Sequence, residues 1–404
     1  MSDLSQPLHS PTPRAAVHAP HHAALIERAR QLGHAFAELA AHHDATGQPP
    51  EAQLEALRAA GLLRLTIDSA HGGHGAGLAV AREVVSAIAY GDPSVALILS
   101  MHYSLHGQMA RSLRLNQGEW PQALAHQLIA ESLQGRSLLN AAQVEPALGS
   151  PSHGGLPATV ARRVGDTWQL SGHKLYVTGV PLLSWISVLA TTDEPEPRLG
   201  SFMVPRHAPG VEVIETWDPV GMRATASHDV VLHQVAIPLG YAVGLRPAQL
   251  GLRRDAQAIA WYFSQVGAVY NGAAHAARDW LVRFLNERKP SALAGAALAS
   301  LPTVQDAVGQ IEVLLATNDW LLQSHAQAYD AGTAPEALGA LVKQVVTDNA
   351  ARAVGQALEL AGNHGLARRN PLERHHRNVL CSLVHAPPNA LLRAHAGRAA
   401  LQPV

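Results

Sequence analysis

Hydrophobic residues recur at intervals of three and four over residues 23–136. This spacing places apolar side chains on one face of a helix and predicts a run of helices. The stretch LEALRAAGLLRL (Leu54–Leu65) is typical of an amphipathic helix that ends near Gly61. Asp92 and Pro93 interrupt a later apolar stretch, and they suit the N-cap and the first turn of a new helix.

The pattern changes over residues 137–245, where β-branched residues alternate with polar ones in segments such as ATVARRV, TWQLSG and DVVLHQVAIP. Turn-forming pairs such as Gly165-Asp166 and Pro209-Gly210 separate these segments. Short alternating strands at this spacing predict an antiparallel barrel or sandwich.

Long alanine-rich helices, apolar on broad faces, return over residues 246–404 and predict a four-helix bundle. The expected fold is therefore α+β but mainly α. It has an N-terminal helical domain (23–136), a middle β-barrel domain (137–245) and a C-terminal bundle (246–404). Residues 1–22 contain four prolines and no long apolar run, so we expect a disordered leader there.

The composition narrows the range of partners and sites. Charged residues make up 15% of the 404 residues and the net charge is −1, which favours neither nucleic acid nor a membrane surface as a partner. No apolar run is long enough to span a membrane. The single cysteine, Cys381, excludes a disulfide within the chain and indicates a reducing, cytoplasmic location. The 24 histidines lack metal-ligand spacing, so no metal site is expected.

Five segments in order carry a resemblance over nearly the whole chain: AHGGHGAGL, AAQVEPALGS, SGHKLYVTG, GMRATASHDVVLHQVAIP and ALELAGNHGLARRNPLERHHRNV. Together they resemble the acyl-CoA dehydrogenase superfamily. The resemblance implies a flavin cofactor (FMN or FAD), a small-molecule substrate and a homotetramer.

The resemblance also implies where the flavin lies. Thr178 matches the residue that bonds the flavin edge, and Tyr176 can shield the ring. Val144 and Ser150 lie in the loop that meets the flavin and its phosphates in this superfamily. Here Val144 replaces the usual hydroxyl residue, so backbone donors would have to serve.

A second group of matched residues lies in the C-terminal domain. Arg288 matches an arginine that reaches the cofactor phosphates, often across a subunit boundary, and Gln305 matches a glutamine of the next helix. Gly362 and Gly365 match a loop near the adenine half of FAD in a neighbouring subunit. The Phe-Gly that usually follows the arginine is replaced by KPSALAG.

The segment RNVLCSLVHAPPNA lacks the catalytic glutamate of the dehydrogenases. His385 and Ala386 stand where the family has Tyr-Glu. A second known position for the base corresponds to about Gln257, with Asp255 two residues away. Because removal of an α-proton needs a carboxylate base, neither position supplies the expected chemistry.

His-x-Pro at this place resembles the flavin monooxygenase branch of the superfamily, the dibenzothiophene monooxygenase type. The resemblance implies reduced flavin from a separate reductase and a C4a-hydroperoxide stabilised by His102 and His385, with Arg377 organising the helix beneath. Two alternatives remain. One is a dehydrogenase with a displaced base, for which the candidates are Glu145, Asp255 and Glu373. The other is a non-catalytic subunit that keeps the flavin fold.

Overall fold

The computed structural model describes residues 18–115, 119–148, 155–252 and 256–401. Ser150, Asp255 and the side chain of Gln257 lie outside the described part, as does most of the expected leader. The first helix begins at Pro20, so the end of that leader is helical. Helices, then strands, then helices follow along the chain, which confirms the expected mainly α architecture.

The N-terminal helices are α1 (Pro20–Thr46), α2 (Glu51–Ala59), α3 (Leu78–Gly91), α4 (Pro93–Leu115) and α5 (Gln122–Leu133). Asp92 caps α4 as expected, because its Oδ1 accepts a hydrogen bond from the backbone N–H of Ser94 at 2.8 Å. The contact between α1 and α3 depends on small residues. A Cβ added to Gly91 would lie 1.7 Å from the carbonyl oxygen of Gly33. Only glycine lets the two backbones approach this closely.

The middle domain contains β1 (Leu139–Ala142), β2 (Val160–Val164), β3 (Thr167–Lys174), β4 (Trp185–Thr192), β5 (Arg198–Pro205), β6 (Val211–Ile214), β7 (Asp229–Pro238) and β8 (Ala242–Pro247). They form one sheet in the order β6-β7-β3-β2-β4-β5-β8, with β1 paired to β4. Most neighbours are antiparallel, as the alternating segments predict. β1 and β2 are exceptions, because each runs parallel to β4.

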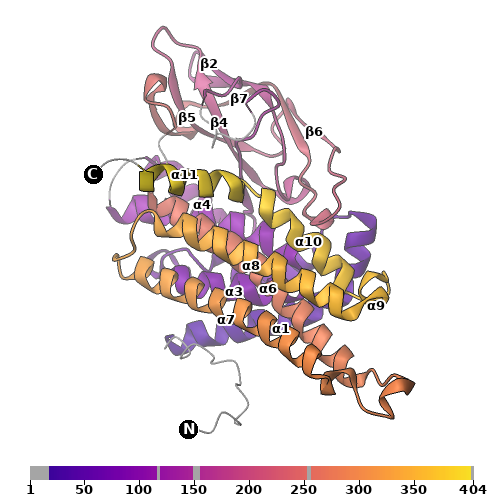
Figure 1. Ribbon diagram of the computed structural model, residues 1–404. Helices are drawn as coiled ribbons and strands as arrows, with labels where there is room; N and C mark the ends of the chain where they lie inside the picture. Colours follow the sequence, from indigo (N-terminus) through magenta and orange to yellow (C-terminus); the bar gives the residue numbers. More distant parts are fainter. Residues whose placement is uncertain (1–17, 116–118, 149–154, 253–255, 402–404) are drawn as a thin grey trace.

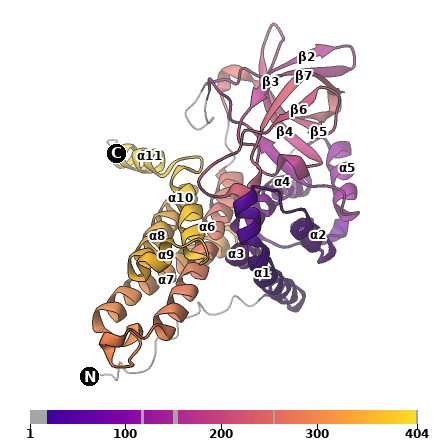
Figure 2. The ribbon, with the colours of Figure 1, turned by 90° about the vertical axis from the view of Figure 1, so that its right-hand side faces the viewer.

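The C-terminal helices are α6 (Ala256–Glu287), α7 (Pro302–Asp330), α8 (Leu338–Ala361), α9 (Asn363–Leu366), α10 (Leu372–Val384) and α11 (Asn389–Leu401). Figure 1 shows the sheet above this bundle, with the connection between α6 and α7 at the end farthest from the sheet. In Figure 2 the N-terminal helices lie beside the bundle and beneath the sheet.

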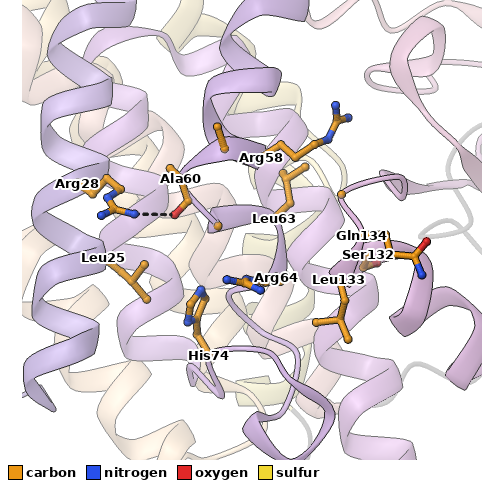
Figure 3. Close-up of a pocket in the computed structure, with 13 residues that line it drawn as sticks. Leu25, Arg28, Arg58, Ala60, Leu63, Arg64, His74, Ser132, Leu133 and Gln134 are labelled. Carbon is orange, nitrogen blue, oxygen red and sulfur yellow. Dashed lines mark hydrogen bonds between the residues drawn. The ribbon is translucent and has the colours of Figure 1, made fainter.

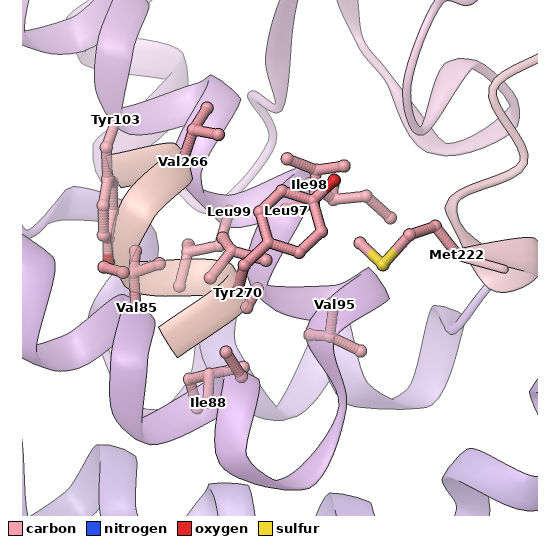
Figure 4. Packing of buried hydrophobic residues seen from close by; sticks show 14 of the residues in the cluster. Val85, Ile88, Val95, Leu97, Ile98, Leu99, Tyr103, Met222, Val266 and Tyr270 are labelled. Carbon is pink, nitrogen blue, oxygen red and sulfur yellow. The ribbon is translucent and has the colours of Figure 1, made fainter. Parts of the chain in front are cut away.

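The three domains meet in a common apolar core. Figure 4 shows Ile98 of α4, Tyr270 of α6 and Met222 of the middle domain in one group of packed side chains. All three are almost completely buried. Because each domain contributes to this core, its packing fixes how the middle domain sits on the helices.

Arg377 of α10 links the same three domains by polar contacts. Its guanidinium makes two hydrogen bonds to the carboxylate of Asp44 at the end of α1, at 2.6 and 3.0 Å. It also donates to the carbonyl oxygen of Val220 and to the carboxylate of Glu373. Arg377 therefore fastens α10 to α1 and to the middle domain.

Candidate active site

Thr178 ends a row of three hydroxyl groups at the edge of the middle domain. The Oγ atoms of Thr225 and Ser227 are 2.8 Å apart, and Ser227 Oγ lies 3.0 Å from Thr178 Oγ1. Asn140 donates to the Thr178 carbonyl oxygen at 2.9 Å and so holds its backbone. Each hydroxyl can donate or accept. Thr225 donates its proton to the Met222 carbonyl oxygen and Ser227 Oγ donates to Thr178 Oγ1, so the Thr178 hydroxyl keeps its own proton for a ligand.

Residues with unfavourable backbone angles surround this row. Tyr176 has φ of 58°, Met222 of 55° and Ala226 of 42°, all in the left-handed region that non-glycine residues rarely adopt. The Tyr176 side chain is 59% exposed, and its ring meets that of Trp217 edge to face at 6.1 Å between centroids. Strained residues of this kind gather at ligand sites. An exposed aromatic ring beside a hydroxyl donor is suited to a flat, partly polar ligand.

His385 follows the last turn of α10 and pairs with Tyr270 of α6. The Tyr270 hydroxyl lies 2.9 Å from His385 Nδ1. Burial raises the pKa of Tyr270 well above its usual range, so the phenol keeps its proton. Burial, and next the charge of Lys343, lower the pKa of His385 to about 3, so the imidazole is neutral. With Tyr270 donating to Nδ1, the imidazole proton lies on Nε2.

Lys343 of α8 holds the loop that carries His385. Its side chain is completely buried. The ammonium group donates to the carbonyl oxygens of His385 and Pro387, both at 3.0 Å, and to Asn389 Oδ1 at 2.7 Å. A fourth, longer contact reaches the carbonyl oxygen of Ser382 at 3.4 Å. A cation at the carboxyl end of a helix also interacts favourably with the helix dipole.

The hydroxyl row and His385 converge through α10. Asn378 Oδ1 accepts a hydrogen bond from the Met222 backbone N–H at 2.7 Å. The Met222 carbonyl oxygen in turn accepts from the Thr225 hydroxyl at 2.8 Å. His385 lies seven residues after Asn378, about 10 Å along a helix. Met222 and Tyr270 share the packed group of Figure 4. Both halves of the candidate site thus border the junction between the sheet and the bundle.

His102 is placed differently from His385. It is completely buried in α4, and both ring nitrogens are occupied. Nε2 lies 2.9 Å from the Leu63 carbonyl oxygen, and Nδ1 accepts from the Leu139 backbone N–H at 3.1 Å. Burial lowers the pKa of His102 to about 4, which keeps the ring neutral. Its one N–H is directed to Leu63, so His102 joins α4 to neighbouring backbone and has no N–H left for a reacting oxygen.

Among the residues expected near the flavin, Val144 is half-buried. Its carbonyl oxygen accepts from the Leu175 backbone N–H at 2.9 Å, and the two residues form an isolated bridge. This contact places Val144 against Leu175, the residue that precedes Tyr176 in the chain. The Val144 side chain offers no hydrogen bond, so only backbone could bind a ligand here.

The second group of matched residues lies at the far end of the bundle. Arg288 is exposed after the last turn of α6, eighteen residues beyond Tyr270, or about 27 Å along the helix. Gln305 donates to the Ala299 carbonyl oxygen, and the His364 ring lies 5.1 Å from that of Phe284 near the end of α6. Gly362 and Gly365 flank His364. Within one subunit, this group lies apart from His385 and Thr178.

Two of the carboxylates considered as displaced bases have structural partners. Glu145 is buried, pairs with the Lys174 ammonium and accepts from the backbone N–H groups of Ala158 and Thr159. Burial alone would raise the pKa of Glu145, but hydrogen bonds from Lys174 and Thr159 hold it below its usual value. Glu373 pairs with Arg377 at 2.7 Å. Both contacts hold elements together, and Asp255 lies outside the described residues.

Several residues of this site could not be identified from the sequence. Ser227, Tyr270 and Lys343 stand in ordinary strand-end or helical context, and only folding reveals their partners. Gln265 of α6 is a further example, because it is completely buried and neither side-chain amide atom bonds to any described residue. A buried amide of this kind calls for a ligand or a bound water.

In the described part of the chain, no helix is both long and apolar enough to cross a membrane. Nor do the described residues contain a group of three or more histidine, cysteine, aspartate or glutamate side chains arranged around a metal ion.

Family models match the chain in three consecutive parts. The N-terminal domain of acyl-CoA dehydrogenase matches residues 19–112, the middle domain residues 141–235 and the C-terminal domain residues 251–401. These parts follow the helical, sheet and helical regions of the structure.

Individual relatives span nearly the same length. The chain is 32% identical to a Bacillus subtilis protein named "Putative acyl-CoA dehydrogenase YdbM", over 90% of this chain and 92% of the relative. It is 29% identical to L-evernosamine nitrososynthase of Micromonospora sp., covering 84% and 80% of the two chains. The structure of KijD3 in complex with FMN and a dTDP-linked amino keto sugar matches with a TM-score of 0.83 and 25% identity, over 95% and 94% of the two chains.

Proposed function

This chain belongs to the acyl-CoA dehydrogenase family, and we propose that it acts as a flavin-dependent monooxygenase supplied with reduced flavin by a separate reductase. One observation carries the proposal. Where the dehydrogenases have their carboxylate base, this chain has Ala386, preceded by the neutral, Tyr270-bonded imidazole of His385. The similarity to a nitrososynthase supports this reading, because forming a nitroso group places oxygen on nitrogen.

The residues at the sheet edge fit a flavin. Thr178 would bond the edge of the ring system and Tyr176 would cover it, while the backbone around Val144 would supply further donors. Because Ser227 donates to Thr178, the Thr178 hydroxyl would keep its proton for an acceptor atom at the edge of the cofactor. A bound reduced flavin would supply the electrons that activate O₂ for insertion into a substrate.

In this proposal His385 is the donor. Its Nε2–H remains for an oxygen atom of a bound ligand, because Tyr270 occupies Nδ1. The low pKa keeps the ring from becoming a cation at neutral pH. A fixed donor of this kind stabilises a developing negative charge without reorganisation. Tyr270 fixes the tautomer, and Lys343 fixes the loop. His102, with both nitrogens bonded, positions α4.

The proposal extends to assembly as a homotetramer. Arg288, Gln305, Gly362 and Gly365 lie at the end of the bundle away from His385, so they would meet a flavin only across a subunit boundary. α7 exposes Val313 by 67% and Trp320 by 62%. These residues lie seven positions apart on one helix face, and large exposed apolar side chains are typical of subunit interfaces. If these four residues contact the adenine half of a cofactor, the cofactor is FAD; if they do not, FMN is favoured.

The test is to load the protein with reduced flavin, mix it with aerated buffer and follow flavin absorbance together with hydrogen peroxide release. The proposed function predicts a transient species distinct from oxidised flavin. His385→Ala should shorten its lifetime about 10²-fold, with more hydrogen peroxide released, because one preorganised donor is lost. Tyr270→Phe should have a smaller effect in the same direction, since it removes the bond that fixes the tautomer.

Tyr262→Phe is a matched control. Its ring also lies against His385, but its hydroxyl donates to the Ala386 carbonyl oxygen instead of the imidazole. It should leave the transient unchanged. Rapid bleaching of the oxidised flavin by an acyl-CoA, with full activity in His385→Ala, would contradict the proposal and favour a dehydrogenase. No flavin binding at all would favour a non-catalytic subunit.

A further inference from the structure

The N-terminal domain contains a hollow of about 350 Å³ between α1, the end of α2 and the end of α5. Arg28, Arg58, Arg64 and His74 line it together with apolar residues such as Leu63 and Leu133. Figure 3 shows the Arg64 and His74 side chains close together in its centre. None of the residues that line it is acidic. Such a concentration of basic groups is unusual in a chain whose net charge is −1.

The arginines of the hollow differ in their partners. Arg28 donates to the Ala60 carbonyl oxygen at 3.3 Å and so caps the end of α2. Arg58 pairs with Glu55. Arg64 stands apart, because no described residue accepts a hydrogen bond from its guanidinium and its Nε is buried. A donor N–H that is buried without an acceptor is costly, so an acceptor from outside the chain is expected for Arg64 Nε.

His74 adds a second donor to the same place. Its Nε2 is also buried; it lies near the backbone of Gly61 and makes no hydrogen bond of good geometry to a described residue. Burial first, and then the charge of Arg64, lower the pKa of His74, while the backbone of Gly61 acts in the opposite direction. The other ionisable groups that act on it are His21 and His22 of α1, which lower it further. An anion between Arg64 and His74 would reverse this balance and favour the protonated imidazole.

We propose that this hollow binds a small tetrahedral dianion, either inorganic phosphate or the phosphate group of a small metabolite, through Arg64 and His74. A guanidinium matches a tetrahedral oxyanion with two parallel N–H groups, and the imidazole adds a third donor. The hollow has room for a phosphate and a short organic group. Because the anion favours the protonated form of His74, its binding is coupled to uptake of a proton. The affinity for the anion therefore rises as the pH falls.

The experiment is calorimetric titration of the flavin-loaded protein with sodium sulfate at ionic strength held constant with sodium chloride, at pH 6 and pH 8. Sulfate keeps its charge over this range, so any pH dependence belongs to the protein. The expected result is one saturable site with tighter binding at pH 6. Titration with inorganic phosphate and with glycerol 3-phosphate then separates the two sources, because only a site shaped for a metabolite prefers the ester.

Variants locate the site. Arg64→Gln should weaken sulfate binding about tenfold or more, because charge-assisted hydrogen bonds are lost. His74→Gln should retain binding but lose its pH dependence. Arg162→Gln is the control, because Arg162 lies on β2 and pairs with Asp193 in solvent. Its binding should equal that of the unmodified protein.

Two results would overturn the proposal. The first is no saturable heat with sulfate or phosphate in the unmodified protein, which would mean that the hollow holds water. The second is unchanged affinity in Arg64→Gln, which would place the anion elsewhere. If Arg64→Gln does not fold, Arg64→Lys keeps the charge but loses the paired N–H groups. It should bind more weakly than the unmodified protein, and equal affinity would again refute the proposal.

Discussion

Replacing Lys343 with methionine tests how the loop of His385 is held. Methionine has nearly the same length and fills the same space, but it cannot donate a hydrogen bond. The substitution leaves four oxygen acceptors without their donor: the carbonyl oxygens of Ser382, His385 and Pro387, and Asn389 Oδ1. The loop loses its anchor while the surrounding core remains filled.

The expected loss of stability follows from two opposing effects. An ammonium has three N–H groups, and hydrogen bonds to charged groups contribute about 1.5 kcal/mol each at the low end, so losing the three short bonds removes about 4.5 kcal/mol. Burial lowers the pKa of Lys343 from 10.5 to about 8. At about 1.36 kcal/mol per pKa unit, keeping the ammonium buried costs about 3 kcal/mol, which methionine recovers. The net destabilisation is therefore about 1.5 kcal/mol.

The assay is urea unfolding at pH 7 combined with hydrogen exchange of the amides in residues 382–390. Exchange there should accelerate in Lys343→Met while the rest of the bundle stays protected. In the unmodified protein, exchange should also accelerate above about pH 8, after correction for its intrinsic pH dependence, because Lys343 then loses its proton. The nearby Asp348 carboxylate raises the pKa of Lys343 and so opposes the loss of this proton.

Gln344→Met is the matched control for this experiment. It places the same new side chain on the next position of α8, where the glutamine side chain contacts Asp348 and not the loop. It should leave exchange in residues 382–390 unchanged. If Lys343→Met has the stability and the exchange rates of this control, the ammonium does not hold the loop and the reasoning is refuted.

Three further predictions concern other parts of the molecule. Thr178→Val should weaken flavin binding about tenfold in a fluorescence titration, with a smaller loss in Ser227→Ala, and an unchanged dissociation constant would remove Thr178 from the site. Glu145→Gln should lower the unfolding free energy by about 3–5 kcal/mol at pH 7, because it leaves Lys174 buried and unpaired. Since the native pKa of Glu145 is lowered, this contribution is present above the usual glutamate pKa and disappears as the pH falls through the native value. Equal unfolding curves would contradict it. Trp320→Asp should dissociate the proposed tetramer in sedimentation, whereas a monomeric unmodified protein would contradict the assembly.

Much of the fold could be predicted from local pattern. Intervals of three and four distinguish the helical regions from the alternating strands, because burial of one face imposes those periods. Asp92 could be identified as a helix cap, since capping depends only on the backbone within three residues. The parallel pairing of β1 and β2 with β4 could not be predicted from the sequence, because alternation within a strand does not specify which strand lies beside it or in which direction.

The candidate site also has features that the sequence predicts and features that depend on the tertiary structure. The sequence by itself determined the family motifs and the replacement of the expected glutamate by Ala386, whereas Tyr176 and Thr178, expected on a strand, follow the end of β3. The tertiary structure decided which groups meet. It brought Tyr270 to His385 across 115 positions and Lys343 to the same loop across more than 40. In the folded chain, both ring nitrogens of His102 also form hydrogen bonds. Local propensity acts over a few residues, whereas these hydrogen bonds form only when helices distant in the chain pack together, so their partners cannot be identified from periodicity or motif spacing.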